Sequence, residues 1–436
     1  MKTIIKTRKI NLRSNMFVLA VDVSKDTIHW IFQSVASVEE EVPKHESPNN
    51  TAAIRELLQD CLKKTGLKAD QIVVACEPTG GYHKKLSNNA KELGMQTVLV
   101  SGKVVHKLEG VEANDNGKSD DRDPRVIFKL VLLKAGLLTD RHLPEHYARL
   151  RELHEEYDFA SSSAAELRCR LHPMTLRLFP DFSFENDFIK SPAGQAFFYM
   201  YGFNPWKAQS DGESTFRQRM ETWLRESKRR VRQETLDRLW QDICATASGP
   251  RPPADLLKDR EQHVGNLIHL LNRYEAMKAE LKRRMEEIYA ETKEAKTLAS
   301  VPLQNFEKAK VIAETGPLDD YQAARQLLRM GGLAIRIRES GTYKGLSKIT
   351  KTGRPLMRKV LYQIVFADLG KNKGLFFQRA MELKGDGQKN QKKRTGKKRM
   401  IQFMRKLLTA IFAVHKSRKS FSQERLFKQE KVKSAA

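Results

Sequence analysis

The sequence lacks the features that would place it in a membrane or an oxidising compartment. Its four cysteines lie far apart and form no Cys-x-x-Cys pair, so we expect reduced thiols and neither zinc nor disulfide chemistry. The basic start is followed by an apolar run, MFVLAVDV, but this run is too short for a signal peptide, contains Asp22 and lacks a small-residue cleavage site. No stretch approaches the roughly 20 apolar residues of a membrane span. We therefore expect a cytoplasmic protein.

Acidic residues are scarce relative to basic ones. The 436 residues include 79 Lys and Arg against 53 Asp and Glu, which gives a net charge of +26. A compact chain with this excess repels itself unless a polyanion covers it, so nucleic acid is the expected partner. The length predicts roughly two to four domains.

The hydrophobic pattern of the first 142 residues alternates between strands and helices. Apolar, β-branched runs predict strands at 16–23, 27–34, 71–77 and 97–102. A helix fits 51–64, and another begins at Pro124, where the missing N–H of proline costs nothing. This alternation predicts an α/β domain over residues 1–142.

Two long helical stripes dominate residues 143–298. Apolar residues step by three and four from Leu150 to Leu171, on a helix expected to stop or kink near Pro173, and again over 256–293. The pattern predicts a coiled-coil region, formed either by an antiparallel pair within one chain or by a dimerisation stalk. The segment 183–255 is less regular and is taken as an insertion.

A third, mainly α-helical domain is expected at 299–383. It contains a helix at 307–315, a loop around SGTYKGLSKITKTG and a helix that starts at Pro355. Residues 384–436 begin as a Gly/Gln/Lys tract and continue as a cationic helix. We expect this tail to be a flexible basic arm laid along phosphates.

The stretch GKSDDRDPRV, starting at Gly117, has two interpretations. A phosphate-binding P-loop requires glycine five residues before Gly117, but Glu112 stands there, and no strand leads directly into the loop. The P-loop interpretation is therefore rejected. The alternative is a pair of carboxylates, Asp120 and Asp123, spaced by three at the start of a helix.

Two further carboxylates strengthen the second interpretation. Asp22 lies inside an apolar strand, where burial without a partner is costly, and Glu77 closes another strand. Four carboxylates brought together repel unless a divalent cation neutralises them, and Mg²⁺ prefers oxygen ligands. Taken singly, each residue also has an ordinary explanation as a helix cap, a turn residue or a strand end, and Asp121 could replace Asp120.

These motifs carry a family resemblance. LAVDVSKDTI, VVACEPTGGY and KSDDRDPRV resemble, in order and spacing, the RuvC-like DEDD domain of insertion-sequence-110 family transposases. MGGLAIRIRESGTYKGLSKITKTGRPLMRKVLY is similar to the C-terminal transposase domain of that family. The chain departs from the family pattern at VPLQNF, where a PGxGP turn is usual, and at Ile335, where proline often follows GLA.

The resemblance implies a site-specific DNA recombinase of a mobile element. Asp22, Glu77, Asp120 and Asp123 would hold Mg²⁺, and Ser340, which precedes a glycine, would be the nucleophile. The resemblance also implies an element-encoded guide RNA, a homo-oligomer (dimer or tetramer) and a bacterial or archaeal, nucleoid-associated setting. The sequence itself shows no zinc finger and no clear helix-turn-helix for reading bases.

A serine hydroxyl needs activation to act as a nucleophile, and no histidine lies near Ser340 in the sequence. Activation would have to come from the metal site across a domain or subunit boundary. Ser347 is the alternative nucleophile. The residues expected to bind nucleic acid are Lys118, Arg338, Lys344, Lys348, Lys351, Arg354, Arg358, Lys392, Lys393, Arg394, Lys397, Lys398 and Arg399.

Two other functions fit the same residues. The first is a metal-dependent endonuclease or junction resolvase that uses only the acidic cluster. The second is an inactive remnant of a mobile element that binds nucleic acid.

Overall fold

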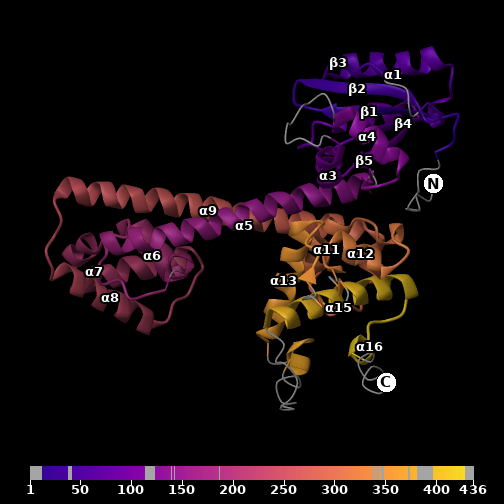
Figure 1. The fold of residues 1–436 in the computed structure, drawn as a ribbon. Coiled ribbons are helices and arrows are strands. Elements are labelled where there is room, and N and C mark those ends of the chain that lie inside the picture. The colour runs from indigo at the N-terminus through magenta and orange to yellow at the C-terminus, as the bar shows by residue number, and fades with distance from the viewer. Residues whose placement is uncertain are drawn as a thin grey trace. The chain divides into compact units, whose positions relative to one another are not determined.

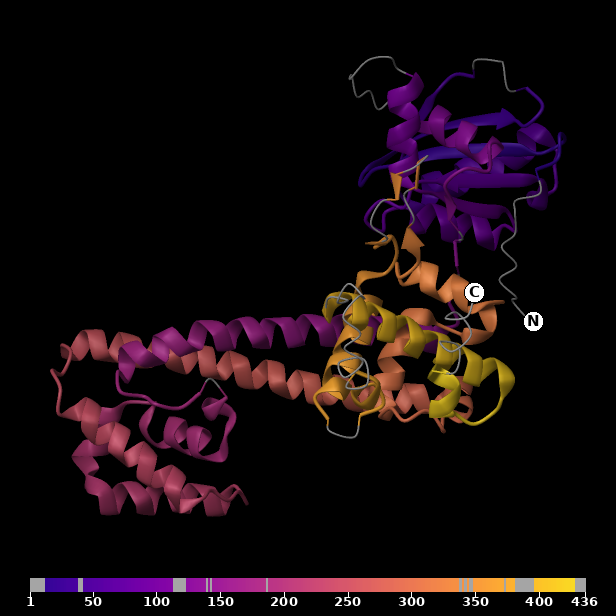
Figure 2. The same cartoon turned by 60° about the horizontal axis from the view of Figure 1, so that its bottom comes forward.

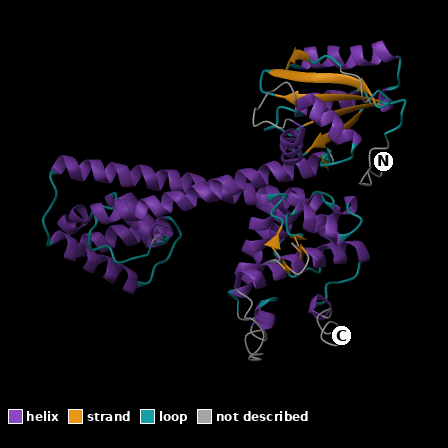
Figure 3. Ribbon diagram, viewed as in Figure 1, coloured by secondary structure: helices purple, strands orange, loops and turns teal. Residues whose placement is uncertain are grey.

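The chain folds into two compact units, Met1–His142 and Leu143–Ala436, coloured along the sequence in Figure 1 and by secondary structure in Figure 3. The structure is a computed structural model. It describes residues 12–37, 42–112, 123–138, 140–141, 143–185, 187–336, 339–340, 343–344, 348–371, 374–380 and 396–427.

The first unit contains a mixed six-stranded sheet, which confirms the α/β prediction. Its strand order is β3-β2-β1-β4-β5-β6, with β1, β4 and β5 parallel and the other three antiparallel to their neighbours. The sequence patterns did not predict the short strands β3 and β6. The strands are β1 (Phe17–Val23), β2 (Thr27–Ser34), β3 (His45–Pro48), β4 (Ile72–Cys76), β5 (Gln96–Val100) and β6 (Leu137–Leu138).

Helices cover both faces of this sheet. On one face, α1 (Thr51–Thr65) and α2 (Lys84–Glu92) pack on Leu19 and Val21 of β1. On the other face, α3 (Gly102–Glu112) and α4 (Asp123–Leu132) pack on Val18 and Ala20. Because successive strand residues point to opposite faces, the parity of a position in β1 or β4 decides which of the two cores it meets.

The second unit is built on two long helices that lie antiparallel, α5 (Glu145–Leu178) and α9 (Ala254–Glu291), side by side in both views (Figures 1 and 2). The predicted second helix is confirmed to within two residues at each end. Although both helices are long, nothing in the described part of the chain is a helix apolar enough to cross a lipid bilayer.

Pro173 does not end α5, contrary to the alternative of a stop at this position. The helix continues to Leu178, although proline removes the bond to the carbonyl four residues back and its ring crowds that carbonyl. That carbonyl belongs to Cys169, an exposed residue. Leu171 and Leu178 on either side of the proline are fully buried and hold the last turns in place.

Residues 183–255, left unassigned by the sequence patterns, form a helical lobe with an aromatic core. Helices α6 (Pro192–Tyr201), α7 (Pro205–Glu226) and α8 (Gln233–Ala247) pack against the α5–α9 pair. The periodic pattern is interrupted because Phe203 has a positive φ and Gly212 is non-helical inside α7. Because these helices are interrupted, their apolar residues form no long periodic stripe that the sequence would reveal.

The rest of the second unit is a helical domain that packs on the N-terminal part of α5 and the C-terminal part of α9. The predicted helices at 307–315 and from Pro355 are confirmed. The helices are α10 (Lys293–Thr297), α11 (Asn305–Thr315), α12 (Ala324–Met330), α13 (Pro355–Leu369), α15 (Gly396–Ser417) and α16 (Gln423–Phe427).

The expectation of a flexible basic arm is wrong for α15. This helix buries Phe403, Leu407, Leu408 and Ile411 in the core of the domain. Its cations lie on the opposite face, so the Lys/Arg-rich composition hid an amphipathic core helix. Residues 381–395, which include the tract before it, lie outside the described residues.

A buried ionic network ties α11 to α5. Glu314 is 0% exposed; its carboxylate accepts hydrogen bonds from Arg354 at 2.7 Å and pairs with His154 at 3.1 Å. Burial by itself would raise the pKa of Glu314, but the bonds from His154 and Arg354 outweigh it and hold that pKa below its usual value. Arg354 also reaches the exposed Glu155 at 3.3 Å.

We expect Glu314→Ala to destabilise the protein by about 3–5 kcal/mol, because it removes the buried carboxylate that His154 and Arg354 share and breaks the network. Glu155→Ala removes the exposed partner of the same arginine and should cost less than about 1 kcal/mol. Since the folded pKa of Glu314 is depressed, its contribution is present above the ordinary value of 4.5 and disappears as the pH falls through the lower folded value. Denaturant titrations from neutral to acid pH measure both effects; equal losses in the two variants would contradict this account.

Candidate active site

Asp22 and Glu77 occupy matching positions on neighbouring parallel strands. The register pairs Val21 of β1 with Cys76 of β4, so Asp22 and Glu77 are the next residues along each strand. Positions of the same parity, such as Ala20 and Ala75, face the core under α3 and α4. By this alternation the two carboxylates project from that same face. Both residues are partly buried.

The remaining two acidic residues are described only in part. Asp123 is the first residue of α4, the helix that packs on the face to which Asp22 and Glu77 belong, but its side chain lies outside the described residues. Asp120 lies wholly outside them. Within the described part of the chain, no group of three His, Cys, Asp or Glu side chains could hold a metal ion.

The neighbours of the two carboxylates include a histidine that sequence reasoning missed. His29 of β2 pairs with Asp22 across the sheet, and its Nε2 lies 3.5 Å from a carboxylate oxygen of Glu46. The 27–34 alternation carried the signal, since it places His29 on the same face as Asp22. By contrast, Cys76 packs on the other face of the sheet with Leu19 and Val21, and burial raises the pKa of its thiol to about 12.

Gly102, the first residue of α3, accommodates the Glu77 side chain. A Cβ at Gly102 would lie 1.9 Å from Glu77 Oε1 and 2.7 Å from its Cδ. The Glu77 carboxylate can therefore occupy its observed position only because residue 102 has no side chain. A pair of carboxylates offers only oxygen ligands, which suit a hard divalent cation.

We expect Gly102→Ala to displace the Glu77 carboxylate and to reduce metal-dependent activity at least about tenfold, as misplacement of a catalytic group does. Because the clashing atoms are the end of a flexible side chain, the thermal unfolding midpoint should change little. Gly265→Ala is the control, since a Cβ there meets only Phe198 at 3.8 Å. Equal activity in the two variants would show that Gly102 does not position Glu77.

Ser340 lies at the end of a short β ribbon between α12 and α13. Strands β7 (Ile335–Arg336) and β10 (Lys348–Ile349) pair at its base. Further out, β8 (Glu339–Ser340) pairs with β9 (Tyr343–Lys344), with Ser340 opposite Tyr343. Ser340 is thus the last paired residue before the two-residue connection. Its side chain, and the whole of Ser347, lie outside the described residues.

Glycines and an arginine close the base of this ribbon. A Cβ at Gly353 would lie 2.1 Å from the carbonyl oxygen of Met330 and 2.7 Å from the nitrogen of Gly332. Arg358 donates to the carbonyl of Gly331 at 3.0 Å and to that of Gly353 at 3.4 Å. The two chain segments at the base of the ribbon are thereby held together.

The cations expected to bind nucleic acid fall into four groups. Arg354 and Arg358 are engaged inside the protein, by Glu314 and by backbone carbonyls respectively. Lys344 is described only by its backbone. Those that lie outside the described residues are Lys118, Arg338, Lys392, Lys393 and Arg394, whereas Lys348, Lys351, Lys397 and Lys398 are exposed and Arg399 is partly exposed.

The positive charge of the chain is concentrated at one end. Residues 299–436 contain 32 Lys and Arg against 10 Asp and Glu, a net +22 out of the total +26. A surface of this kind attracts phosphate backbones irrespective of base sequence. The domain that carries Ser340 is therefore also the one with the electrostatics of a nucleic-acid interface.

Comparison with protein families decides the identity. Residues 19–180 match the IS110 DEDD model, described as a transposase, and residues 303–376 match the model described as "Transposase IS116/IS110/IS902 family". Together the matches span more than half of the chain. The chain belongs to the IS110 family of transposases. The first match includes all four acidic residues, and the second includes Ser340. No curated protein matches the sequence.

As an IS110-family transposase, the protein is an enzyme that recombines DNA for an insertion element, and it therefore binds DNA. A DEDD-type domain is consistent with dependence on divalent metal ions. The two family matches thus cover the region with the four acidic residues and the region with Ser340 separately.

Proposed function

We propose that this IS110-family transposase cleaves and rejoins DNA at specific sites, with Ser340 as the nucleophile and Asp22, Glu77, Asp120 and Asp123 as ligands of Mg²⁺. The observation that carries the proposal is the register of β1 and β4, which puts Asp22 and Glu77 next to each other on one face. Carboxylate oxygens on neighbouring strands are ligands of the kind that Mg²⁺ prefers.

The acidic residues suit this role because every donor is a carboxylate oxygen. In our proposal the first unit is RuvC-like, and the absence of a Cβ at Gly102 lets the Glu77 carboxylate lie where it does. When bound, Mg²⁺ would stabilise negative charge on the phosphate oxygens. The antiparallel α5–α9 pair would act as a coiled coil.

The chemical step is a transesterification. Ser340 Oγ forms a bond to the phosphorus of a DNA phosphodiester, the bond between phosphorus and one strand oxygen breaks, and that oxygen leaves as a hydroxyl after taking up a proton. The proton of the serine passes to a base or to water. The product is a phosphoserine ester, and attack by a strand hydroxyl reverses the step and joins two DNA ends. No external energy source is needed, since one phosphodiester replaces another.

Target choice would rest on an RNA encoded by the element. The net +22 of residues 299–436 supports binding of a second polyanion besides DNA. A homo-oligomer, dimer or tetramer, would bring the several strand ends of a recombination event together. Base pairing would then supply the sequence specificity, while the protein contacts the backbones.

The test is reconstituted strand exchange. Purified protein, Mg²⁺, the element's own RNA and two DNA duplexes with the element's junction sequences should yield joined products that sequencing identifies. We expect no product when EDTA is added. Cleaved but never rejoined DNA would instead indicate a nuclease.

A further inference from the structure

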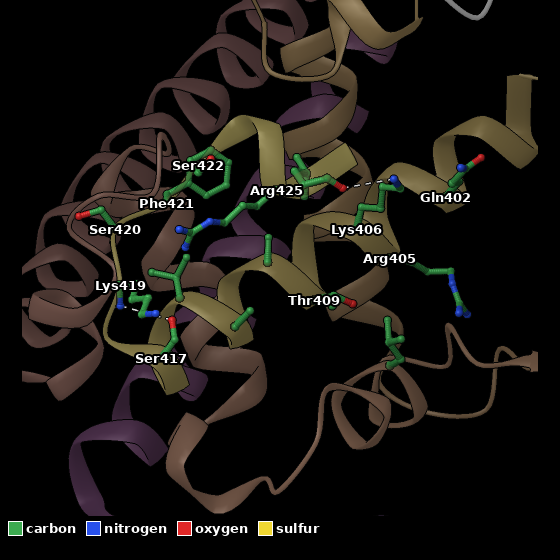
Figure 4. Close-up of a pocket in the computed structure, with 15 residues that line it drawn as sticks. Gln402, Arg405, Lys406, Thr409, Ser417, Lys419, Ser420, Phe421, Ser422 and Arg425 are labelled. Atoms are coloured by element: carbon green, nitrogen blue, oxygen red, sulfur yellow. Dashed lines mark hydrogen bonds between the residues drawn. The ribbon is translucent and has the colours of Figure 1, made fainter. Parts of the chain in front are cut away.

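A cation-lined cavity of about 420 Å³ lies between α15 and α16, well separated in sequence from Ser340. Helix α15, from Gln402 to Ser417, provides one wall, and the segment 419–422 with α16 provides the other (Figure 4). Leu328 of α12 completes the lining. No role has been given to this cavity by the proposed function.

The composition of the lining is one-sided. Its ionisable members are Arg405, Lys406, Lys419 and Arg425, four hydroxyl side chains stand among them, and no carboxylate contributes to the lining. Cations this close together repel one another unless an anion is bound. In the chain as a whole, most of the excess positive charge also belongs to this domain.

Neighbouring cations show what a structural role looks like here. Lys416 and Arg418 lie 3.7 and 3.8 Å from Asp319. Lys419 and Arg425, both exposed, have no acidic partner anywhere in the described part of the chain. In Figure 4 the Arg425 side chain extends from α16 toward the segment that carries Lys419 and Ser420. The two charges therefore remain available for a ligand.

The walls are held in place by other contacts. Lys406 Nζ donates to the carbonyl of Leu426 at 3.2 Å and lies 4.9 Å from the centre of the Phe427 ring. The backbone N–H of Phe421 donates to Ser300 Oγ at 2.9 Å. Arg405 donates to the carbonyl of Leu333. These bonds fix α16 and the 417–422 segment while leaving Lys419 and Arg425 free of them.

We propose that this cavity binds one nucleotide unit of a single-stranded nucleic acid, with its phosphate between Lys419 and Arg425. The apolar part of the wall, with Ala410, Ala413, Val414 and the ring of Phe421, offers a surface for the sugar and base. The volume suits a ligand of this size. The proposal rests on the proposed function only in taking nucleic acid as the anion. A strand is favoured over a free nucleotide because exposed Lys397 and Lys398 lie along the same helix.

The test is a binding assay with the full-length protein in EDTA, using short labelled single strands of DNA and of RNA with the same sequence. Fluorescence anisotropy compares wild type with the double variant Lys419→Glu, Arg425→Glu. The matched control is Lys258→Glu, Arg251→Glu, two exposed cations outside the cavity, which changes the total charge equally. Thermal unfolding confirms that both variants are folded, and Lys419→Arg with Arg425→Lys tests for charge alone.

We expect the cavity variant to bind at least one of the two strands about tenfold more weakly and to show a smaller salt dependence, by about 0.7 in the logarithmic slope for each lost phosphate contact. The control should bind nearly as wild type, and the Arg/Lys exchange should retain most of the affinity. The strand that loses more affinity is the natural occupant. Equal losses in cavity and control variants would overturn the proposal, and so would displacement of the strand by a mononucleotide at equal concentration.

This assay does not depend on strand exchange. Because no cleavage occurs in EDTA, a negative result would leave the roles of Ser340 and the acidic residues untouched. Conversely, an inactive serine or aspartate could not by itself alter the binding result.

Discussion

Ser340→Ala is expected to abolish strand cleavage and exchange, with a loss of at least about a thousandfold, the scale seen when a nucleophile is removed from an enzyme. The reason is that the Ser340 hydroxyl forms the covalent link to DNA in the proposed mechanism. Product formation from labelled duplexes, measured under single-turnover conditions, gives the rate. DNA affinity should be unchanged, since the hydroxyl contributes no charge.

Ser347→Ala is the matched control, because it removes the same hydroxyl from the same segment between α12 and α13. It should retain near wild-type activity. If Ser347→Ala were inactive and Ser340→Ala active, the nucleophile would be Ser347. If both variants still rejoined strands, the acidic residues alone would perform the chemistry, as in a junction resolvase.

Asp22→Asn should reduce activity by about 10²–10³-fold, as removal of one group that stabilises transition-state charge does. The substitution keeps the size of the side chain and removes its charge next to Glu77. A second readout does not require activity: thermal unfolding with Mg²⁺ and with EDTA reports binding of the ion. The stabilisation that Mg²⁺ gives the wild type should be lost.

Asp26→Asn is the control for Asp22. Asp26 lies in the exposed turn between β1 and β2, and only its carbonyl is used, as an acceptor for the Asn49 N–H at 2.8 Å. The Asp26→Asn variant should keep the activity of the wild type and should still be stabilised by Mg²⁺. A wild-type protein that Mg²⁺ fails to stabilise would contradict the metal site itself.

The α/β unit could be predicted because its central strands are short apolar runs, which are typical of buried strands. The runs 18–21 and 72–76 are apolar and buried on both faces of the sheet, so their type and order are evident. The edge strands β3 and β6 could not be found, since one is polar and exposed and the other has only two residues. Their pairing is decided by the sheet that they join.

Tertiary packing explains the other differences. The helical lobe at 183–255 depends on contacts among aromatic residues distant in sequence, such as Phe182 and Phe203, which no local pattern encodes. Likewise, nothing in the sequence tells Arg354, a partner of buried Glu314, from Lys351, which is exposed. Composition marks cations, whereas burial decides which of them face outward.

For the candidate site, the sequence predicted which acidic residues are involved, and the structure adds that Asp22 and Glu77 follow paired positions on neighbouring strands. Asp22 and Glu77 stood out as charges at strands, yet only the register shows them adjacent. Ser340 was identified by family resemblance, since a serine before glycine is common in turns. Gly102 and His29 could not be predicted from the sequence, because they matter only through their neighbours: Gly102 lies against Glu77, and His29 pairs with Asp22.

The most direct measurement is the identification of the residue that becomes covalently attached to DNA. The protein is incubated with Mg²⁺, the element's RNA and a DNA substrate that traps the cleaved intermediate, and the attached peptide is then mapped by mass spectrometry. We predict a nucleotide-modified peptide with the modification on Ser340. A modification at any other residue, or active strand exchange with no covalent intermediate at all, would contradict the account.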